Sequence, residues 1–167
     1  TIEQKELTLV AEQINIPDKP FRVGVGFRNV DTVFFHVVKV SQKDIDKIKV
    51  MEYEVKFNEL TKYPVYKSWI QQLPLDGDYQ DHFTEIKVDG LPRGAYYLIA
   101  CTSAGFSLSE NKLIAQEIII SNLSYFASGN DYYGTSNKDF YVLDRSTGKP
   151  IKGASIQTFR KEYDYNK

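Results

Sequence analysis

The stretch Phe21–Val40, FRVGVGFRNVDTVFFHVVKV, decides the fold predicted for this chain. Over residues 21–28, apolar residues alternate with arginine or glycine, which is typical of a strand with one buried face. Arg28–Asp31 indicates a turn, because Asn and Asp adopt unusual backbone angles and can bond their own backbone. Val33–Val40 is almost wholly apolar, as in a strand covered on both faces. The pattern predicts an antiparallel hairpin that other segments must cover, since such a hairpin is not stable alone in water.

Composition favours strands and narrows the classes of partner. The 167 residues include 12 Tyr and 10 Phe but one Met, and 42% are hydrophobic, which is enough for a sizeable core. The net charge of −1 argues against nucleic acid as a partner, because a nucleic-acid-binding face is clearly basic. The longest apolar run, Ala95–Cys101, is far shorter than a membrane span. The chain starts at Thr1 without a basic and apolar leader, so we expect a removed signal or, in preference, an internal piece of a longer chain.

Further segments predict an antiparallel sandwich. Alternation or apolar runs place strands at residues 3–16, 49–57, 63–73, 82–88, 95–102 and 113–121. One short helix is expected over 41–48, where Ser41 and Asp44 fit a capping box. Trp69 and Cys101 are expected in the core, and a single cysteine allows no internal disulfide. About seven strands with frequent turn signals predict an all-β, immunoglobulin- or fibronectin-III-like antiparallel β-sandwich.

The strand pattern starts again after this first domain. Residues 124–127 and 140–144 resemble strands, 144–150 a hairpin turn, and 151–163 a returning strand. Some 45 residues are too few to close a second sandwich alone. We therefore expect a β-sandwich at 1–122, followed at 123–167 by the opening strands of a second, truncated sandwich or by a strand extension.

Three stretches together resemble one family. They are the opening stretch FRVGVGFRNVDTVFFHVVKV, the segment LPLDGDYQDHFTEIKVDGLPRGAYYLIACTS, and the junction ISNLSYFASGN with the later FYVLDRSTGKPIKGASIQTF. The chain is thereby identified as similar to bacterial alpha-2-macroglobulin-like proteins, in particular those of the Bacteroidetes. The resemblance is to a macroglobulin-type domain, of the MG2 kind, from the N-terminal region.

The resemblance implies a structural role rather than an activity. Such proteins are very long chains of sandwich domains, periplasmic, anchored to the outer membrane or extracellular, which trap proteases after cleavage of a bait region. Many carry a thioester within a C-x-E-Q motif, but Cys101 is followed by Thr102-Ser103-Ala104, so nothing covalent is carried over. We expect no catalysis and no cofactor. The implied partners are neighbouring domains of the same chain, with proteases engaged only through the full-length parent.

Two groups of residues suggest a bound ion or phosphate but have simpler explanations. Asp76, Asp78 and Asp81 are a weak candidate metal site for Ca²⁺, although the EF-hand pattern is absent and a solvated acidic loop is favoured. Gly24 and Gly26 resemble part of a phosphate-binding loop, but they lie inside a strand, where close packing or a bulge is the better explanation.

The two histidines and one sequon are further candidate sites. His36 and His82 lack further ligand types for zinc and show no nucleophile elbow nearby, so we expect His36 to be a satisfied core or rim residue. Asn122-Leu123-Ser124 fits a glycosylation sequon, which in a bacterial chain is better explained as the linker between modules.

An aromatic cluster near that linker supports a competing function. It consists of Tyr125, Phe126, Tyr132, Tyr133, Phe140 and Tyr141. If exposed, these rings would stack on sugars in a cell-surface adhesin or carbohydrate-binding module, although burial against the first domain or a missing one is favoured. The strand edges of a truncated domain also predict self-association through residues 123–167.

Overall fold

The computed structural model describes residues 4–74, 77–108, 112–129, 131–132, 135–136 and 138–157. The chain divides into two compact units, Thr1–Ser121 and Asn122–Lys167, and each is described here by itself. No helix in the described ranges is both long and apolar enough to cross a membrane.

The first unit is the predicted β-sandwich. Its three-stranded antiparallel sheet has the order β1 (Glu6–Ala11), β3 (Phe21–Arg28), β6 (His82–Val88). Its five-stranded sheet has the order β2 (Ile14–Asn15), β8 (Leu113–Ile120), β7 (Gly94–Cys101), β4 (Thr32–Val40), β5 (Val65–Gln72). Only β2, which has two residues, runs parallel to its neighbour. The other seven described strands of this unit agree with the number expected.

The predicted hairpin over Phe21–Val40 is wrong. β3 pairs with β1 and β6, whereas the next strand, β4, pairs with β5 and β7 in the other sheet. The turn between them, which includes Asn29 at φ 55°, carries the chain across the sandwich. Alternation showed correctly which side chains point inward, but it cannot show whether two successive strands lie side by side or face each other.

The two sheets enclose the main core. Inward rows of both sheets meet there, and Trp69 packs against them by stacking on Phe35, with ring centroids 4.8 Å apart. The fully buried members include Val23, Val25, Val33, Phe35, Tyr96, Leu98 and Ile118. The side chains at the Val25 and Phe35 positions therefore come from opposite sheets.

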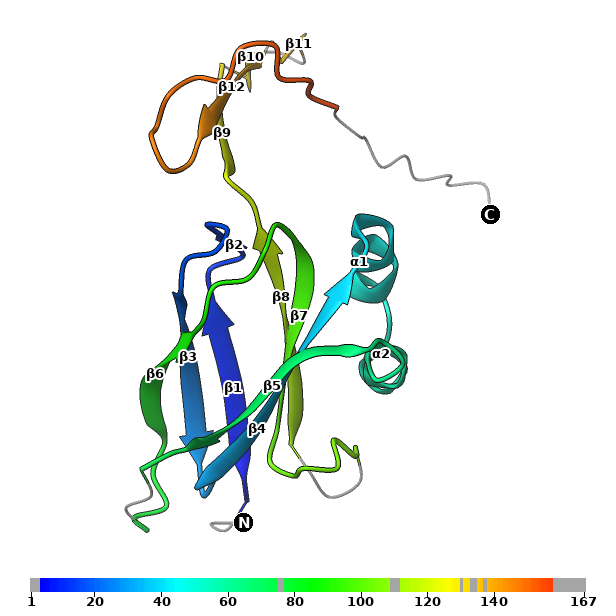
Figure 1. Cartoon of the computed structure of the whole chain (residues 1–167), viewed down its shortest axis with the longest axis vertical. Coiled ribbons are helices and arrows are strands. Elements are labelled where there is room, and N and C mark those ends of the chain that lie inside the picture. Colours follow the sequence, from blue (N-terminus) through cyan, green and yellow to red (C-terminus); the bar gives the residue numbers. More distant parts are fainter. Residues whose placement is uncertain are drawn as a thin grey trace. The chain divides into compact units, whose positions relative to one another are not determined.

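Two helices cover the outer face of the five-stranded sheet, on the side away from β1, β3 and β6 (Figure 1). α1 (Gln42–Lys49) begins at Ser41, whose Oγ accepts a hydrogen bond from the Asp44 N–H at 3.1 Å, so the predicted helix and its cap are confirmed. The strand expected over 49–57 is wrong, because this segment leads into α2 (Tyr53–Leu60). The alternation in the sequence placed Val55 on the buried face of a strand, but its side chain is 54% exposed.

A second core lies beneath these helices. It contains Val38, Val40, Ile45, Ile48, Phe57, Leu60, Ala95, Tyr97, Ile99, Cys101 and Leu113. Alternate side chains of β7 thus enter one core or the other, and seven of its eight residues are buried. The prediction of a strand covered on both faces is confirmed for β7 and also for β4, whose side chains likewise enter both cores.

The second unit contains a two-stranded ribbon, β9 (Leu123–Ser128) paired antiparallel with β12 (Asp139–Asp144). The short strands β10 (Asp131–Tyr132) and β11 (Thr135–Ser136) pair with each other. A turn follows β12 and returns to it through a single bridge between Leu143 and Pro150. The strand predicted over 151–163 is absent from its described part, 151–157, and residues 158–163 lie outside the described residues.

Candidate functional site

In the acidic loop that holds Asp76, Asp78 and Asp81, the described carboxylates contact other groups of the protein. Asp78 accepts hydrogen bonds from the Gln80 N–H and contacts His82 Nε2, both at 2.9 Å. These bonds, that of Gln80 first, hold the pKa of Asp78 below its ordinary value. Asp81 forms an ion pair with Arg28 at 3.2 Å, and Asp76 lies outside the described residues. No group of three potential metal-ligating side chains occurs among the residues described.

The two strand glycines are explained by side chains that lie over them. A Cβ at Gly24 would lie 2.3 Å from Cζ of Phe83, and a Cβ at Gly26 would lie 2.3 Å from Oγ1 of Thr8. Both neighbours come from the strands that flank β3. Close packing across the outer face of the three-stranded sheet, as expected, accounts for the pair.

The histidines are not brought together, because His36 lies on β4 and His82 on β6, in different sheets. His36 stacks on Phe106 with ring centroids 3.7 Å apart and an interplanar angle of 14°. Burial lowers the pKa of His36, which favours the neutral imidazole. His82 stacks on Phe27 at 5.5 Å as well as contacting Asp78.

His36 and Phe106 also line a hollow of about 220 Å³ near the end of α2. Its other walls include Leu60, Tyr63 and the hydroxyl-bearing Thr61. The Thr61 hydroxyl donates to the Asn58 carbonyl at 3.1 Å, so it is already engaged. The lining therefore offers a mainly apolar niche beside a neutral imidazole, and it does not combine an activated nucleophile with a base.

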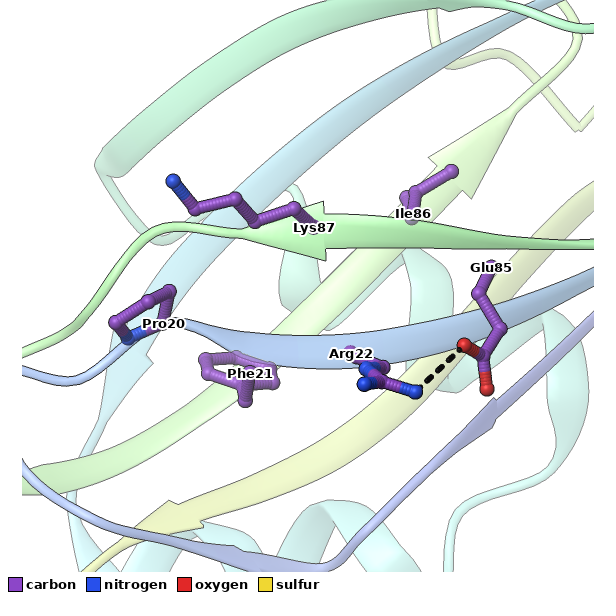
Figure 2. A pocket seen from close by; sticks show the side chains of 6 residues that line it. All are labelled: Pro20, Phe21, Arg22, Glu85, Ile86 and Lys87. Carbon is purple, nitrogen blue, oxygen red and sulfur yellow. Dashed lines mark hydrogen bonds and ion pairs between the residues drawn. The ribbon is translucent and has the colours of Figure 1, made fainter.

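A larger hollow, of about 360 Å³, is lined by residues at and beside β3 and β6 of the three-stranded sheet. Figure 2 shows Arg22 and Glu85 joined by an ion pair of 3.1 Å, while Lys87 extends away from them. Both partners of the ion pair are more than half exposed, and the hollow is lined by Pro20, Phe21 and Ile86 as well as by the three charged side chains. Exposed pairs of this kind contribute little energy and are common on sheet faces.

Cys101 is buried in the second core, as expected for a small hydrophobic residue. Burial raises the pKa of its thiol, which disfavours the reactive thiolate. The position thus offers neither the cationic surroundings nor the exposure of a reactive cysteine.

The sequon residue Asn122 anchors the turn after β12. Its Nδ2 donates to the Asp144 carboxylate at 2.5 Å, and its Oδ1 accepts from the Ser146 hydroxyl at 2.7 Å. Asp144 in turn accepts from the N–H and hydroxyl of Thr147, and these bonds lower its pKa. A glycan on Nδ2 of Asn122 would disrupt these hydrogen bonds. The network therefore favours the interpretation of this segment as a linker between modules over a glycosylation site.

The aromatic cluster remains open to solvent at several positions. Tyr125, Phe126 and Tyr141 are 68%, 50% and 47% exposed. The burial of these rings against the first unit or against a further domain stays a prediction. Phe126 and Tyr141 are cross-strand partners and stack at 4.7 Å with an interplanar angle of 11°. The side chain of Tyr132 and the whole of Tyr133 lie outside the described residues.

Comparison with known proteins identifies the fold. The sequence matches no family profile and no curated protein. Among solved structures, the chain is similar to native alpha-2-macroglobulin from Escherichia coli, in a crystal structure that spans domains MG0-NIE-MG1. The TM-score is 0.55 at 14% identity, and the match covers 88% of this chain and 48% of that chain, so this chain spans about half of that fragment. The chain thus has the macroglobulin-type β-sandwich fold that the sequence resemblance implied.

Proposed function

We propose that this chain is a non-catalytic structural module of a large alpha-2-macroglobulin-like protein. The structural similarity carries the proposal. The match covers 88% of this chain, whereas the first unit holds only 121 of the 167 residues. The similarity therefore includes part of the second unit, as expected for successive modules of one long chain. The engagement of the candidate site residues by their own neighbours is consistent with a scaffold.

In this role the module contacts neighbouring domains, and the trapping of proteases belongs to the full-length parent. A bacterial envelope location follows from the same proposal: the periplasm, the outer membrane or the extracellular space. A source in the Bacteroidetes and the MG2 position rest on the sequence resemblance alone, since the solved neighbour spans domains named MG0, NIE and MG1.

The proposal is tested by comparing the full-length parent with the 167-residue chain. After mixing with a broad-specificity protease, the parent should carry the protease with it on a native gel and protect a folded protein substrate. The isolated chain should do neither. Inhibition by the isolated chain, or a parent that ends near Lys167, would contradict the proposal.

The exposed aromatic pair supports a second candidate, a cell-surface adhesin or carbohydrate-binding module. The Phe126–Tyr141 stack is flanked on the same ribbon face by Ser124, Ser128 and Asp139, which offer hydroxyl and carboxylate partners for sugar hydroxyls. Binding on a glycan array that disappears in a Tyr141→Ala variant would favour this candidate. Retention of binding in that variant would remove the aromatic pair as its basis.

A further inference from the structure

The hollow of about 220 Å³ beside His36, called the His36 hollow from here on, lies on the helix side of the five-stranded sheet. Val38 of β4 and Ile99 of β7 are 1% and 3% exposed, so they form its floor. Leu60 of α2 and Phe106 of the loop after β7 also line it, and both pack on the second core. The hollow is therefore a gap in the layer that covers this face of the sheet.

The wall that Phe106 forms with His36 is fixed by an unusual backbone conformation. The φ of Phe106 is 46°, in the left-handed region that aromatic residues seldom adopt. Its N–H donates to the Ser103 carbonyl at 3.2 Å, and its ring stacks on His36. Residues in such conformations persist only where their surroundings hold them, and they concentrate at binding sites. The wall is thus in place before anything binds.

The lining excludes a charged occupant and supplies one polar partner. None of the described residues that line the His36 hollow is Asp, Glu, Lys or Arg, so an ion there would lose its hydration without a counter-charge. The ring nitrogens of His36 have no hydrogen-bond partner among the residues that the structure describes. Because burial lowers the pKa of His36, its ring is neutral and offers one donor and one acceptor.

The size of the hollow fits a single side chain. Pockets for small ligands and cofactors usually measure about 300–1,000 Å³, which is more than the volume beside His36. The phenol of tyrosine has a flat apolar ring, and its hydroxyl both donates and accepts, so it can pair with either nitrogen of a neutral imidazole. An indole N–H only donates, and a phenyl ring has no such group. Tyrosine is thus the side chain that complements this lining best.

Apolar side chains continue from the hollow along strand β5. Val65, which lines the hollow, is 48% exposed, and Ile70 is 60% exposed. Ile70 pairs with Phe34, so its side chain lies on the same sheet face as that of His36. A pocket for one aromatic anchor, set within apolar surroundings, is typical of the centre of a protein–protein interface.

We propose that the His36 hollow receives the tyrosine side chain of a neighbouring domain of the parent protein, a domain outside residues 1–167. The tyrosine ring packs on the apolar floor, and its hydroxyl bonds with a ring nitrogen of His36. The existence of that neighbour rests on the proposed function. Its source is placed outside this chain because Tyr125 and Tyr141, in the second unit, contact aromatic rings of their own ribbon.

Binding of p-cresol, which is the tyrosine side chain as a free molecule, tests the hollow on the 167-residue chain. Toluene is the matched ring without a hydroxyl. Methyl NMR signals of Val65 and Ile99 should report a p-cresol Kd on the order of 1 mM, roughly three- to tenfold below that of toluene. His36→Phe keeps a ring against Phe106 without its nitrogens, so it should abolish this difference. His82→Phe, at the histidine of the other sheet, should preserve it.

A second variant covers the case in which His36→Phe disturbs the sheet. Val65 is about half exposed, so Val65→Phe should leave the fold intact while its larger side chain fills part of the hollow. Binding of both p-cresol and toluene should then be lost. The proposal would be overturned by equal affinities for the two molecules in the unsubstituted chain, by the absence of p-cresol binding, or by binding that survives Val65→Phe.

A photo-cross-linker in the full-length parent tests the source of the tyrosine. Ala104 is an exposed residue of the lining, and p-benzoylphenylalanine introduced there should attach to a tyrosine-containing segment outside residues 1–167, located by mass spectrometry. Cross-links confined to residues 1–167 would overturn the proposal even where p-cresol binds. Neither experiment measures protease trapping. A parent that gives the expected cross-link but traps no protease would therefore contradict the proposed trapping alone.

Discussion

At the scale of single residues, two glycines of the first unit differ in what surrounds them. A Cβ at Gly90 would lie 2.4 Å from the carbonyl carbon of Asp18 and 2.8 Å from the Lys19 nitrogen. These backbone atoms are held in place, because the Asp18 N–H donates to the Leu91 carbonyl at 2.9 Å. At Gly24 the obstacle is instead the tip of the Phe83 ring, which is 64% exposed and free to swing outward.

Gly90→Ala should therefore destabilise the fold by about 1–3 kcal/mol, since the backbone must shift to make room. Gly24→Ala should cost less, because the Phe83 ring can move into solvent. Urea unfolding of both variants measures the difference. Equal losses would show that the contact between Asp18 and Gly90 is not as tight as the structure indicates.

His36 gives the fold a dependence on pH. Burial lowers its pKa in the folded state, so between its folded pKa and the unfolded value of about 6.5 the unfolded chain binds more protons. Stability should consequently fall as pH drops below about 6.5. His36→Phe keeps an aromatic partner for Phe106 without a titrating group, and its melting temperature should change less between pH 7.5 and pH 5. An unchanged pH slope in this variant would show that His36 is not responsible.

At the scale of elements, α2 shows how a helix is anchored over a sheet. Leu60 is fully buried in the second core, while Val55 on the same helix is 54% exposed. Leu60→Ala should cost about 2–5 kcal/mol, because it leaves a cavity beneath the helix. Val55→Ala should stay within about 0.5 kcal/mol. Similar losses in chemical denaturation would mean that α2 covers the sheet with a different face.

The sequence predicted most elements but not their partners. The periodicity of β3, β6 and β7 and the cap at Ser41 are local signals, and the structure confirms them. Whether β3 pairs with β4 depends on which surfaces meet across the core, and alternation holds no such information. α2 was missed for a related reason, because its buried Phe57 and Leu60 are spaced as in a helix but follow exposed residues that imitate a strand.

At the candidate sites, the sequence favoured simple explanations but could not show the partners of the side chains. The residue types at Asp78, His82 and Asn122 suggested ions or glycans, but their actual partners depend on which loops meet. Gly24 is explained by Phe83, a residue almost 60 positions away in the sequence, which pairs with Gly26, two residues further along β3. Contacts of this kind follow from strand order, which the sequence alone left open.

At the scale of the whole molecule, the first unit contains both cores described here. Every residue of the main core and the second core lies before Ser121, whose N–H donates to the Asn15 carbonyl at 2.9 Å. A domain needs its own core to fold alone, and this unit has one on each face of its larger sheet. The two-stranded ribbon of the second unit has no comparable core among its described residues, and such ribbons are marginally stable in isolation.

We therefore expect a chain that ends at Ser121 to fold by itself. Its thermal unfolding, followed by circular dichroism, should be cooperative and have a midpoint within a few degrees of the full chain, because none of the removed residues that the structure describes contributes to either core. Val25→Asp in the shortened chain is the control, since a charge in the main core should abolish the cooperative transition. A shortened chain that fails to fold would show that residues after Ser121 are needed to stabilise the sandwich, and the division into two modules would then be wrong.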